Sequence, residues 1–235
     1  MLPLVLSVHA PDAGGGDGFV ADAAVFGELD CKPGFVATSV VVPEPLPLAF
    51  VAKQLTAAEG AGPIAAIRIG FLRGADQAEL LARTVSRLAV PAIVACPERA
   101  GADALLDGPT RSAIVRHVYP VARVIVVRAA DVAASGGGEI EDLSSLREAA
   151  ARLRAQGARA VVISGWLRQG RVVDLLDDGG TLRVLDTARI QVPRVSGLAG
   201  AYAASLAAHV ARGLPLAEAA DAAQRYIGLR LHRGR

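Results

Sequence analysis

Short apolar runs alternate with amphipathic stretches along the whole chain, and this alternation is typical of βαβ units. Each run has the length of a buried strand, too short for a helix that crosses a core. The runs predicted as strands are residues 2–8, 36–42, 64–69, 92–95, 124–127 and 160–163. We therefore expect an α/β fold with a mostly parallel central sheet covered by helices.

The stretches between and after these runs predict helices, several of which carry end signals. One predicted helix begins near Phe19. Four others cover residues 76–88, 145–157, 198–212 and 215–231. Ser145 with Glu148 forms a capping-box pattern, and Gly157 and Gly213 follow predicted helix ends. Pro215 is expected in the first turn of the last helix, where its missing N–H costs nothing.

The pattern changes after residue 171, where two short apolar runs flank a turn. Residues 172–176 and 182–185 lie on either side of Asp177-Asp178-Gly179-Gly180, a strong hairpin signal. An antiparallel hairpin extension should therefore follow the parallel part of the sheet.

Composition narrows the class of protein. The chain has 235 residues, of which 52% are hydrophobic and 20% charged, which suits a large buried core and excludes disorder. We expect one domain over residues 1–235. The formal net charge of +2 is far from the concentrated basic surface of a nucleic-acid-binding protein, so nucleic acid is not an expected partner.

Cysteine usage and the N-terminus bear on location. Cys31 and Cys96 are far apart and have no CxxC or Cys/His pattern around them, so neither a disulfide framework nor a metal site is expected. The first apolar run has no basic segment before it and is followed at once by polar, glycine-rich sequence, which predicts a strand and no membrane span. A reducing, cytoplasmic setting is the simplest expectation.

Two glycine-rich segments are candidate sites. Residues 12–18, DAGGGDG, follow the first strand and precede a helix, where backbone and helix N-terminal amides favour an anion. Residues 195–202, VSGLAGAY, run into a long alanine-rich helix and would expose a similar row of amides. For each segment the alternative is structural: a plain βα turn in the first case and tight helix packing in the second.

At these segments the chain resembles the hydroxymethylpyrimidine/phosphomethylpyrimidine kinases of thiamine biosynthesis, members of the ribokinase-like superfamily. LSVHAPDAGGGDGFVADAAVF is similar to their opening AGSDxSGGAGIQAD-type motif, with matches at Asp12, Gly16 and Asp22 among others. Further matches are IRIGFL at 67–72, like VKIGML, and GARAVV and ARGLPL nearer the C-terminus. The resemblance runs almost the whole length in order.

The resemblance implies a ribokinase-like three-layer α/β/α sandwich, usually a homodimer, that phosphorylates a pyrimidine with ATP and Mg²⁺. It implies substrate-binding positions at Asp12, Gly16, Asp22, Pro43 and Glu44. It places the catalytic anion hole at Gly197, Leu198, Ala199 and Gly200, and nucleotide-binding positions at Arg128, Asp131 and Ser164. No metal-binding side chain is assigned; Mg²⁺ is expected only with ATP.

The chain departs from the family at its catalytic positions. The family cysteine beside the substrate hydroxyl is Gly200, an asparagine of the family's TPNxxE segment is Arg128, and a lysine of its VKGG segment is Ser164. Phosphoryl transfer depends on positioned cations and amides, and the loss of one such group costs about 10²–10³ in rate. Three functions therefore remain open: a kinase with degenerate motifs, a non-catalytic homologue that binds a pyrimidine or regulates a partner, and a drifted kinase that acts on another small alcohol.

Three single residues stay undecided. His9 directly follows the first predicted strand and is either a substrate contact or a histidine satisfied by backbone. Asp17 stands where the family has alanine, and either repels phosphate or faces water. Cys96 is either a stand-in thiol or a buried structural cysteine.

Overall fold

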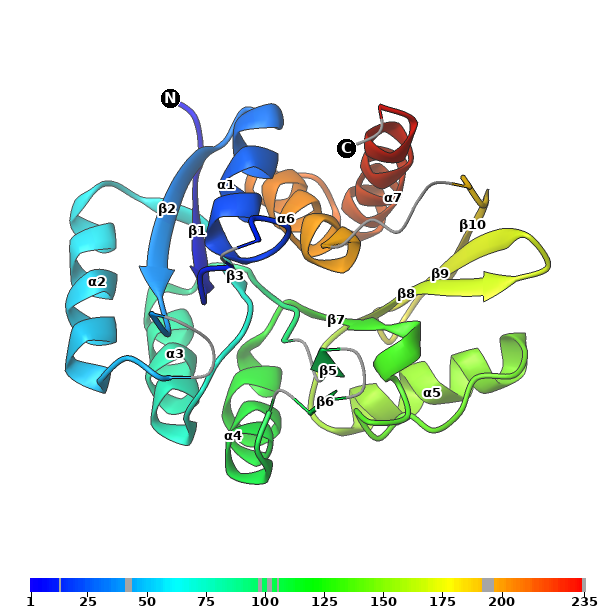
Figure 1. The fold of residues 1–235 in the computed structure, drawn as a ribbon, viewed down its shortest axis with the longest axis horizontal. Coiled ribbons are helices and arrows are strands. Elements are labelled where there is room, and N and C mark those ends of the chain that lie inside the picture. The colour runs from blue at the N-terminus through cyan, green and yellow to red at the C-terminus, as the bar shows by residue number, and fades with distance from the viewer. Residues whose placement is uncertain are drawn as a thin grey trace.

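The computed structural model describes residues 1–12, 14–40, 44–96, 99–100, 103–104, 106–191 and 197–233. Across these residues, eight strands form one sheet in the order β10-β9-β8-β7-β4-β3-β1-β2 (Figure 1). Its strands are Leu4–His9 (β1), Lys32–Ala37 (β2), Ile64–Ile69 (β3), Ala92–Val94 (β4), Val124–Arg128 (β7), Val161–Arg168 (β8), Arg171–Asp177 (β9) and Leu182–Ala188 (β10). A separate short antiparallel pair joins Arg99–Ala100 (β5) to Asp103–Ala104 (β6).

The sheet has a parallel part and an antiparallel end, as the sequence predicts. β1 pairs in parallel with both β2 and β3, and the parallel pairing continues through β4 and β7 to β8. β9 and β10 pair antiparallel, and the Asp178 carboxylate accepts hydrogen bonds from the backbone N–H groups of Gly180 and Thr181 in the turn between them. The α/β fold with a hairpin extension is thus confirmed.

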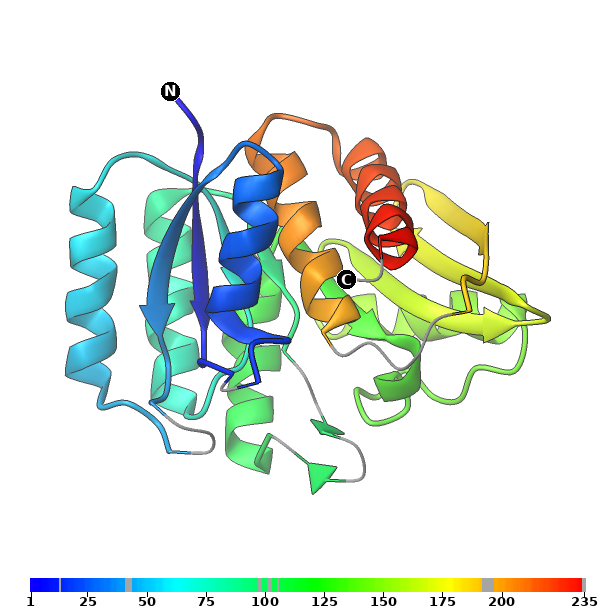
Figure 2. The same ribbon diagram turned by 45° about the horizontal axis from the view of Figure 1, so that its top comes forward.

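Helices cover both faces of this sheet and make a three-layer sandwich. The helices are Gly18–Glu28 (α1), Leu48–Gly60 (α2), Ala75–Leu88 (α3), Gly108–Ala113 (α4), Leu143–Ala155 (α5), Leu198–Ala211 (α6) and Leu216–His232 (α7), and α4 continues through a π-helical turn, Ile114–Val118. Figures 1 and 2 show α1, α6 and α7 on one face, and α2, α3, α4 and α5 on the other. No helix within the described ranges is long and apolar enough to span a bilayer.

Strand periodicity divides the buried side chains between two cores. Along β1, Leu6 and Val8 belong to the core beneath α2–α5, whereas Val5 belongs to the core beneath α1, α6 and α7. Since successive side chains of a strand point to opposite faces, Ser7 and His9 lie on the same face as Val5. By the same alternation Arg68 follows Ala66 on β3. Polar side chains of both strands therefore lie under α1 and α6.

The second strand lies earlier in the chain than the apolar pattern predicts. The apolar pattern predicts it at residues 36–42, whereas β2 covers Lys32–Ala37, and residues 41–43 lie outside the described ranges. Lys32, Pro33 and Gly34 are poor strand residues, but β2 is an edge strand that pairs only with β1 in the described sheet. An edge strand tolerates proline and glycine because one of its sides makes no ladder hydrogen bonds.

Two helix starts also differ from the prediction. In α5 the capping box is formed by Asp142 and Ser145: the Asp142 carboxylate accepts from the Ser145 N–H, and Ser145 Oγ accepts from the Asp142 N–H. Ser145 is thus the third residue of the helix and not its cap, and Glu148 instead pairs with Arg152. Pro215 is the residue before the first turn of α7, one position earlier than expected.

Candidate functional site

The candidate site lies at the carboxyl ends of β1 and β3. β1 is followed by α1 on one face of the sheet, while its neighbour β3 is followed by α3 on the other (Figure 1). In open α/β sheets this divergence of connections leaves a crevice outside the strand ends, where ligands bind. The segment 10–17 between β1 and α1, and the start of α6, both belong to this end of the sheet.

The first glycine-rich loop is organised by its own carboxylate. Asp12 accepts hydrogen bonds from the backbone N–H groups of Gly14 (3.0 Å), Gly16 (2.9 Å) and Asp17 (3.0 Å). These amides, expected from the sequence to face a ligand anion, thus bind an internal anion. Asp12, expected to contact substrate, is placed as the acceptor that holds the loop in shape.

The second glycine segment packs directly against the first. Gly197 has a φ of +75°, and a Cβ on it would overlap the carbonyl oxygen of Gly16. Gly197 is the N-cap of α6 and has no side chain to cap the helix. The N–H groups of Leu198, Ala199 and Gly200 lie in the first turn, where an α-helix offers them no carbonyl acceptor of its own. The two loops that the sequence singled out therefore meet, and the positive end of α6 lies at their junction.

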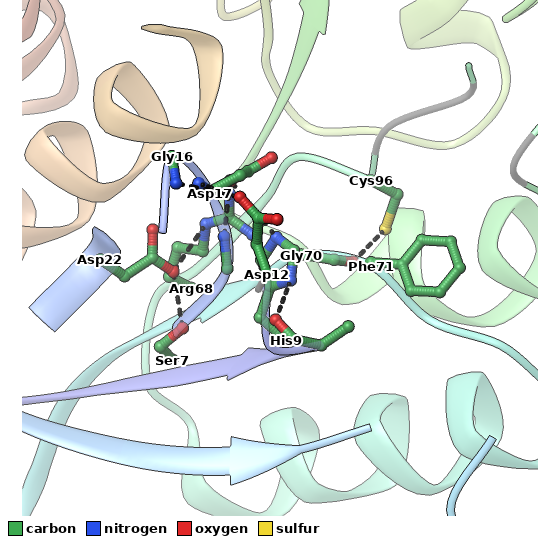
Figure 3. Close-up of polar contacts among 12 residues, drawn as sticks. Ser7, His9, Asp12, Gly16, Asp17, Asp22, Arg68, Gly70, Phe71 and Cys96 are labelled. Carbon is green, nitrogen blue, oxygen red and sulfur yellow. Dashed lines mark hydrogen bonds and ion pairs between the residues drawn. The ribbon is translucent and has the colours of Figure 1, made fainter. Parts of the chain in front are cut away.

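A buried ion pair lies beneath this junction (Figure 3). Arg68 and Asp22 are each 1% exposed, and Arg68 Nε lies 3.3 Å from Asp22 Oδ2, which also accepts a hydrogen bond from Ser7 Oγ at 2.6 Å. Burial raises the pKa of the Asp22 carboxyl, and the Arg68 charge and the Ser7 hydrogen bond oppose this rise. Asp22, predicted to contact substrate, is placed out of reach of solvent and anchors α1 to β1 and β3.

His9 ends β1 beside the same pair. It is 4% exposed, its Nδ1 lies 3.0 Å from the Ala10 carbonyl oxygen, and its Nε2 lies 3.7 Å from Asp17 Oδ1. Burial, with the nearby Arg68 charge, lowers the pKa of His9 well below its ordinary value, so the ring is neutral at pH 7. Because a carbonyl only accepts, Nδ1 carries the hydrogen and Nε2 carries the lone pair.

Asp17 caps the start of α1 and reaches the start of α6. Its Oδ1 accepts from the Gly18 N–H at 2.9 Å, and its side chain remains 39% exposed. A Cβ on Gly200 would overlap that same Oδ1 and would lie 3.6 Å from Arg68 Nη2. The undecided Asp17 is therefore a helix cap whose carboxylate lies against Gly200.

The predicted nucleotide-binding residues form a second group, at the ends of β7 and β8. Arg128 and Ser164 are register partners on these two strands, and Arg128 Nε lies 2.5 Å from Asp131 Oδ2. Ser164 is 8% exposed and Asp131 5%. On the substrate side, Glu44 is exposed.

Three other positions raised from the sequence have different outcomes. Pro43 and Ser196 lie outside the described residues. The Cys96 thiol donates to the Gly70 carbonyl oxygen at 2.9 Å, at the end of β3 (Figure 3).

No side chain of the site is assigned to a magnesium ion. Within the described ranges no three His, Cys, Asp or Glu side chains group closely enough to hold a metal ion. The acid at the nucleotide end, Asp131, is engaged by Arg128. No step of the chemistry is therefore assigned to a metal held by the protein.

Sequence reasoning missed Ser7 and Arg68 as members of the site. The signal was present, since each is a polar residue between apolar neighbours in a buried strand, Leu4–His9 or Ile64–Ile69. A charged residue in the middle of a buried strand requires a partner, and the aspartate of α1 supplies it. The sequence alone does not show which acidic residue lies opposite Arg68.

Comparisons with known proteins match nearly the whole chain. A family model described as phosphomethylpyrimidine kinase matches residues 12–234. A hydroxymethylpyrimidine/phosphomethylpyrimidine kinase of Synechococcus elongatus is 30% identical, covering 96% of this chain and 90% of that protein. A pyridoxine kinase of Bacillus subtilis is also 30% identical, covering 94% and 88%. Among solved structures, the pyridoxal kinase from Staphylococcus aureus in complex with AMP-PCP has a TM-score of 0.87 at 25% identity, covering 97% of this chain and 87% of that one.

Proposed function

Because the chain belongs to the phosphomethylpyrimidine kinase family, we propose that it transfers the γ-phosphoryl group of ATP to hydroxymethylpyrimidine or to its monophosphate. The observation that carries the proposal is the contact of Gly197 with Gly16, which joins the two glycine loops at the switch point of the sheet. Phosphoryl transfer requires positioning and electrostatic stabilisation more than covalent chemistry by the protein. Amides at a helix end supply both.

In this proposal the first turn of α6 receives the phosphoryl group. The N–H groups of Leu198, Ala199 and Gly200 are the donors, and the positive end of α6 favours the charge that develops in the transition state. Asp12 and Gly16 shape the loop on the substrate side, where the Gly16 amide is already bound to the Asp12 carboxylate. The loop is held by the Asp12 carboxylate and packs against Gly197 at the start of the helix.

The remaining predicted residues take roles on either side of the junction. We assign the nucleotide to the ends of β7 and β8, where Arg128 provides a cation beside Asp131 and Ser164. Arg128 is not equivalent to a lysine, since its guanidinium is planar and here is oriented by Asp131. Glu44, with Pro43 next to it in sequence, is assigned to the pyrimidine edge.

A second substrate class follows from one comparison. The pyridoxine kinase of Bacillus subtilis is as similar to this chain as the pyrimidine kinase of Synechococcus elongatus, at 30% identity. Pyridoxine and hydroxymethylpyrimidine both present a hydroxymethyl group on a six-membered heteroaromatic ring. Pyridoxine is therefore the natural competitor in any assay of specificity.

The experiment is ADP release by the purified chain with excess MgATP and one alcohol at a time: hydroxymethylpyrimidine, its monophosphate, or pyridoxine. We expect turnover with a pyrimidine and a kcat/KM at least tenfold above that for pyridoxine. Calorimetric titration of each ligand separates binding from catalysis. Pyrimidine binding without turnover would support the non-catalytic alternative, and a preference for pyridoxine would move the assignment to that substrate.

Quaternary structure and location rest on the family alone. We propose a homodimer in the cytoplasm, as the family resemblance implies. Size-exclusion chromatography with light scattering tests the first point, since a homodimer has twice the mass of the chain. Fractionation of the source cells tests the second.

A further inference from the structure

Asp17 and Gly200 make an unusual contact at the junction of the two loops. Gly200 lies in the first turn of α6, and a Cβ at this position would overlap Asp17 Oδ1 and lie 3.2 Å from Asp17 Cγ. Any side chain at position 200 would therefore displace the carboxylate. The absence of a side chain at Gly200 is what allows an acid from the first loop to reach the positive end of α6.

Three aspartates lie near the junction, and Asp17 is the one whose carboxylate is neither buried nor bound to several loop amides (Figure 3). Asp12 accepts three amide hydrogen bonds from its own loop. Asp22 is 1% exposed and held by Arg68 and Ser7. The Asp17 side chain is 39% exposed and lies beside the amides proposed to hold the phosphoryl group.

The surroundings of Asp17 suit proton transfer. His9 Nε2 carries a lone pair, is buried without a hydrogen-bond donor among the described residues, and lies 3.7 Å from Asp17 Oδ1. Arg68 Nη2 lies 3.6 Å from the point where a Gly200 Cβ would be, so a buried cation lies beneath the contact between Asp17 and Gly200.

We propose that Asp17 is the catalytic base of the phosphoryl transfer, an inference that rests on the proposed function. The hydroxyl proton of the substrate passes to an Asp17 carboxylate oxygen, and the hydroxyl oxygen forms a bond to the γ-phosphorus. The bond between the γ-phosphorus and the bridging oxygen breaks, and its electron pair leaves with ADP. After product release the proton passes from Asp17 to solvent. His9 is a positioning residue, whose Nε2 lone pair lies 3.7 Å from the Asp17 carboxylate.

Two departures from the family meet at this contact. The family that the chain resembles carries alanine at the position of Asp17 and cysteine at the position of Gly200. The two departures are spatially complementary, since the carboxylate fills the place that a side chain on Gly200 would take. Loss of the cysteine side chain alone would leave a gap here, and the Asp17 carboxylate occupies that space.

The test compares Asp17→Asn, Asp17→Ala and an exposed control, Asp186→Asn, whose carboxylate pairs with Arg171 in the distant hairpin. Asn keeps an oxygen to cap the Gly18 N–H but cannot take a proton, so we expect kcat to fall about 10²–10³-fold with KM changed less than threefold. The melting temperature should stay near that of the wild type. Asp186→Asn should leave kcat unchanged.

Chemical rescue and a double substitution exclude a purely structural role. Added formate should restore part of kcat to Asp17→Ala, where it can enter the vacated space, and not to Asp17→Asn. Asp17→Ala with Gly200→Cys should regain at least tenfold over Asp17→Ala alone, whereas Gly200→Cys by itself should be inactive because its Cβ overlaps the carboxylate.

Three results would contradict the proposal, and each shows whether the role of Asp17 or the kinase function fails. A wild type that turns over, with an Asp17→Asn variant whose kcat stays within threefold, overturns the role of Asp17 and leaves the kinase function standing. A rise in KM at unchanged kcat also overturns it, because Asp17 would then act in binding only. A wild type without turnover on any of the alcohols overturns the kinase function together with this inference.

Discussion

Gly197 lies against the backbone carbonyl of Gly16, so closely that no side chain could be accommodated between them. This contact joins a loop after the first strand to a helix start near the end of the chain. Since neither residue carries a side chain, the approach is limited only by backbone atoms. The shape of the proposed phosphate site therefore depends on these two glycines as well as on the Asp12 carboxylate that holds the loop.

A methyl group at position 197 should open this junction. For Gly197→Ala we expect a loss of roughly 2–5 kcal/mol in the free energy of unfolding, from backbone strain at positive φ and from overpacking. Gly170→Ala is the matched control, because Gly170 also has a φ of +75° but has no atom within 4 Å of its added Cβ. Urea denaturation should show only about 1–2 kcal/mol for the control. Equal losses in both variants would mean that the contact is unimportant.

Removal of the Asp12 carboxylate should loosen the first loop. Asp12→Ala leaves the amides of Gly14, Gly16 and Asp17 without their acceptor, and we expect a loss of about 1–2 kcal/mol, as for a helix cap. Asp12→Asn should be intermediate, since one of its side-chain oxygens is replaced by a donor. Amide hydrogen exchange at these residues should accelerate in the order Asp, Asn, Ala. Unchanged exchange in the alanine variant would refute the assignment.

The Arg68–Asp22 pair should show strong coupling. Arg68→Met leaves the Asp22 carboxylate buried without its cation and should cost about 3–5 kcal/mol, whereas a double variant with Asp22→Asn should cost less than the sum of the two single changes. Arg171→Ala, which breaks an exposed pair with Asp186, should cost less than about 1 kcal/mol. Denaturant unfolding of the four variants measures this; strict additivity at 68 and 22 would contradict a direct pair.

Asp174 should make stability depend on pH. It is 3% exposed, accepts from the Gly165 N–H and from Gln224 Nε2, and burial raises its pKa from 3.8 to about 6. The folded state therefore holds a proton that the unfolded state releases near pH 4, so this group's contribution is full below pH 4 and is lost as pH rises through 6. The loss is on the order of 3 kcal/mol. Asp174→Asn should remove it.

Thermal unfolding of the wild type and Asp174→Asn between pH 4 and pH 8 provides the check. The variant should gain stability relative to the wild type as pH rises, with the difference levelling off above pH 7. A constant difference across this range would show that Asp174 does not titrate near 6.

Most of the fold could be predicted because each strand, helix or turn is marked by residues that are neighbours in the sequence. The hairpin around Asp178 was recognisable from its turn residues, and the buried strands from their apolar runs. β2 was misplaced because Lys32, Pro33 and Gly34 do not look like a strand, and only their place at the edge of the sheet beside β1 makes them one. That place is a property of the tertiary structure.

The two loops of the site could be predicted from the sequence, but the contacts between them could not. Both glycine loops could be located, since one follows a strand and the other begins a helix. The contact of Gly197 with Gly16, the burial of Asp22 against Arg68, and the approach of Asp17 to Gly200 involve residues far apart in sequence. No local pattern specifies such pairs, and the substrate role given to Asp22 from the resemblance could not anticipate its burial.

The most direct measurement is single-turnover transfer of label from [γ-³³P]ATP to hydroxymethylpyrimidine, with the product identified by chromatography. It should be run on the wild type, on Gly197→Asp and on the matched Gly170→Asp, after each is shown to be folded. We expect labelled pyrimidine phosphate from the wild type and Gly170→Asp, and a loss of at least 10²-fold with Gly197→Asp, whose side chain would overlap the Gly16 carbonyl oxygen and open the junction. Absence of labelled product from the folded wild type, or equal transfer by all three proteins, would contradict a kinase centred on this junction.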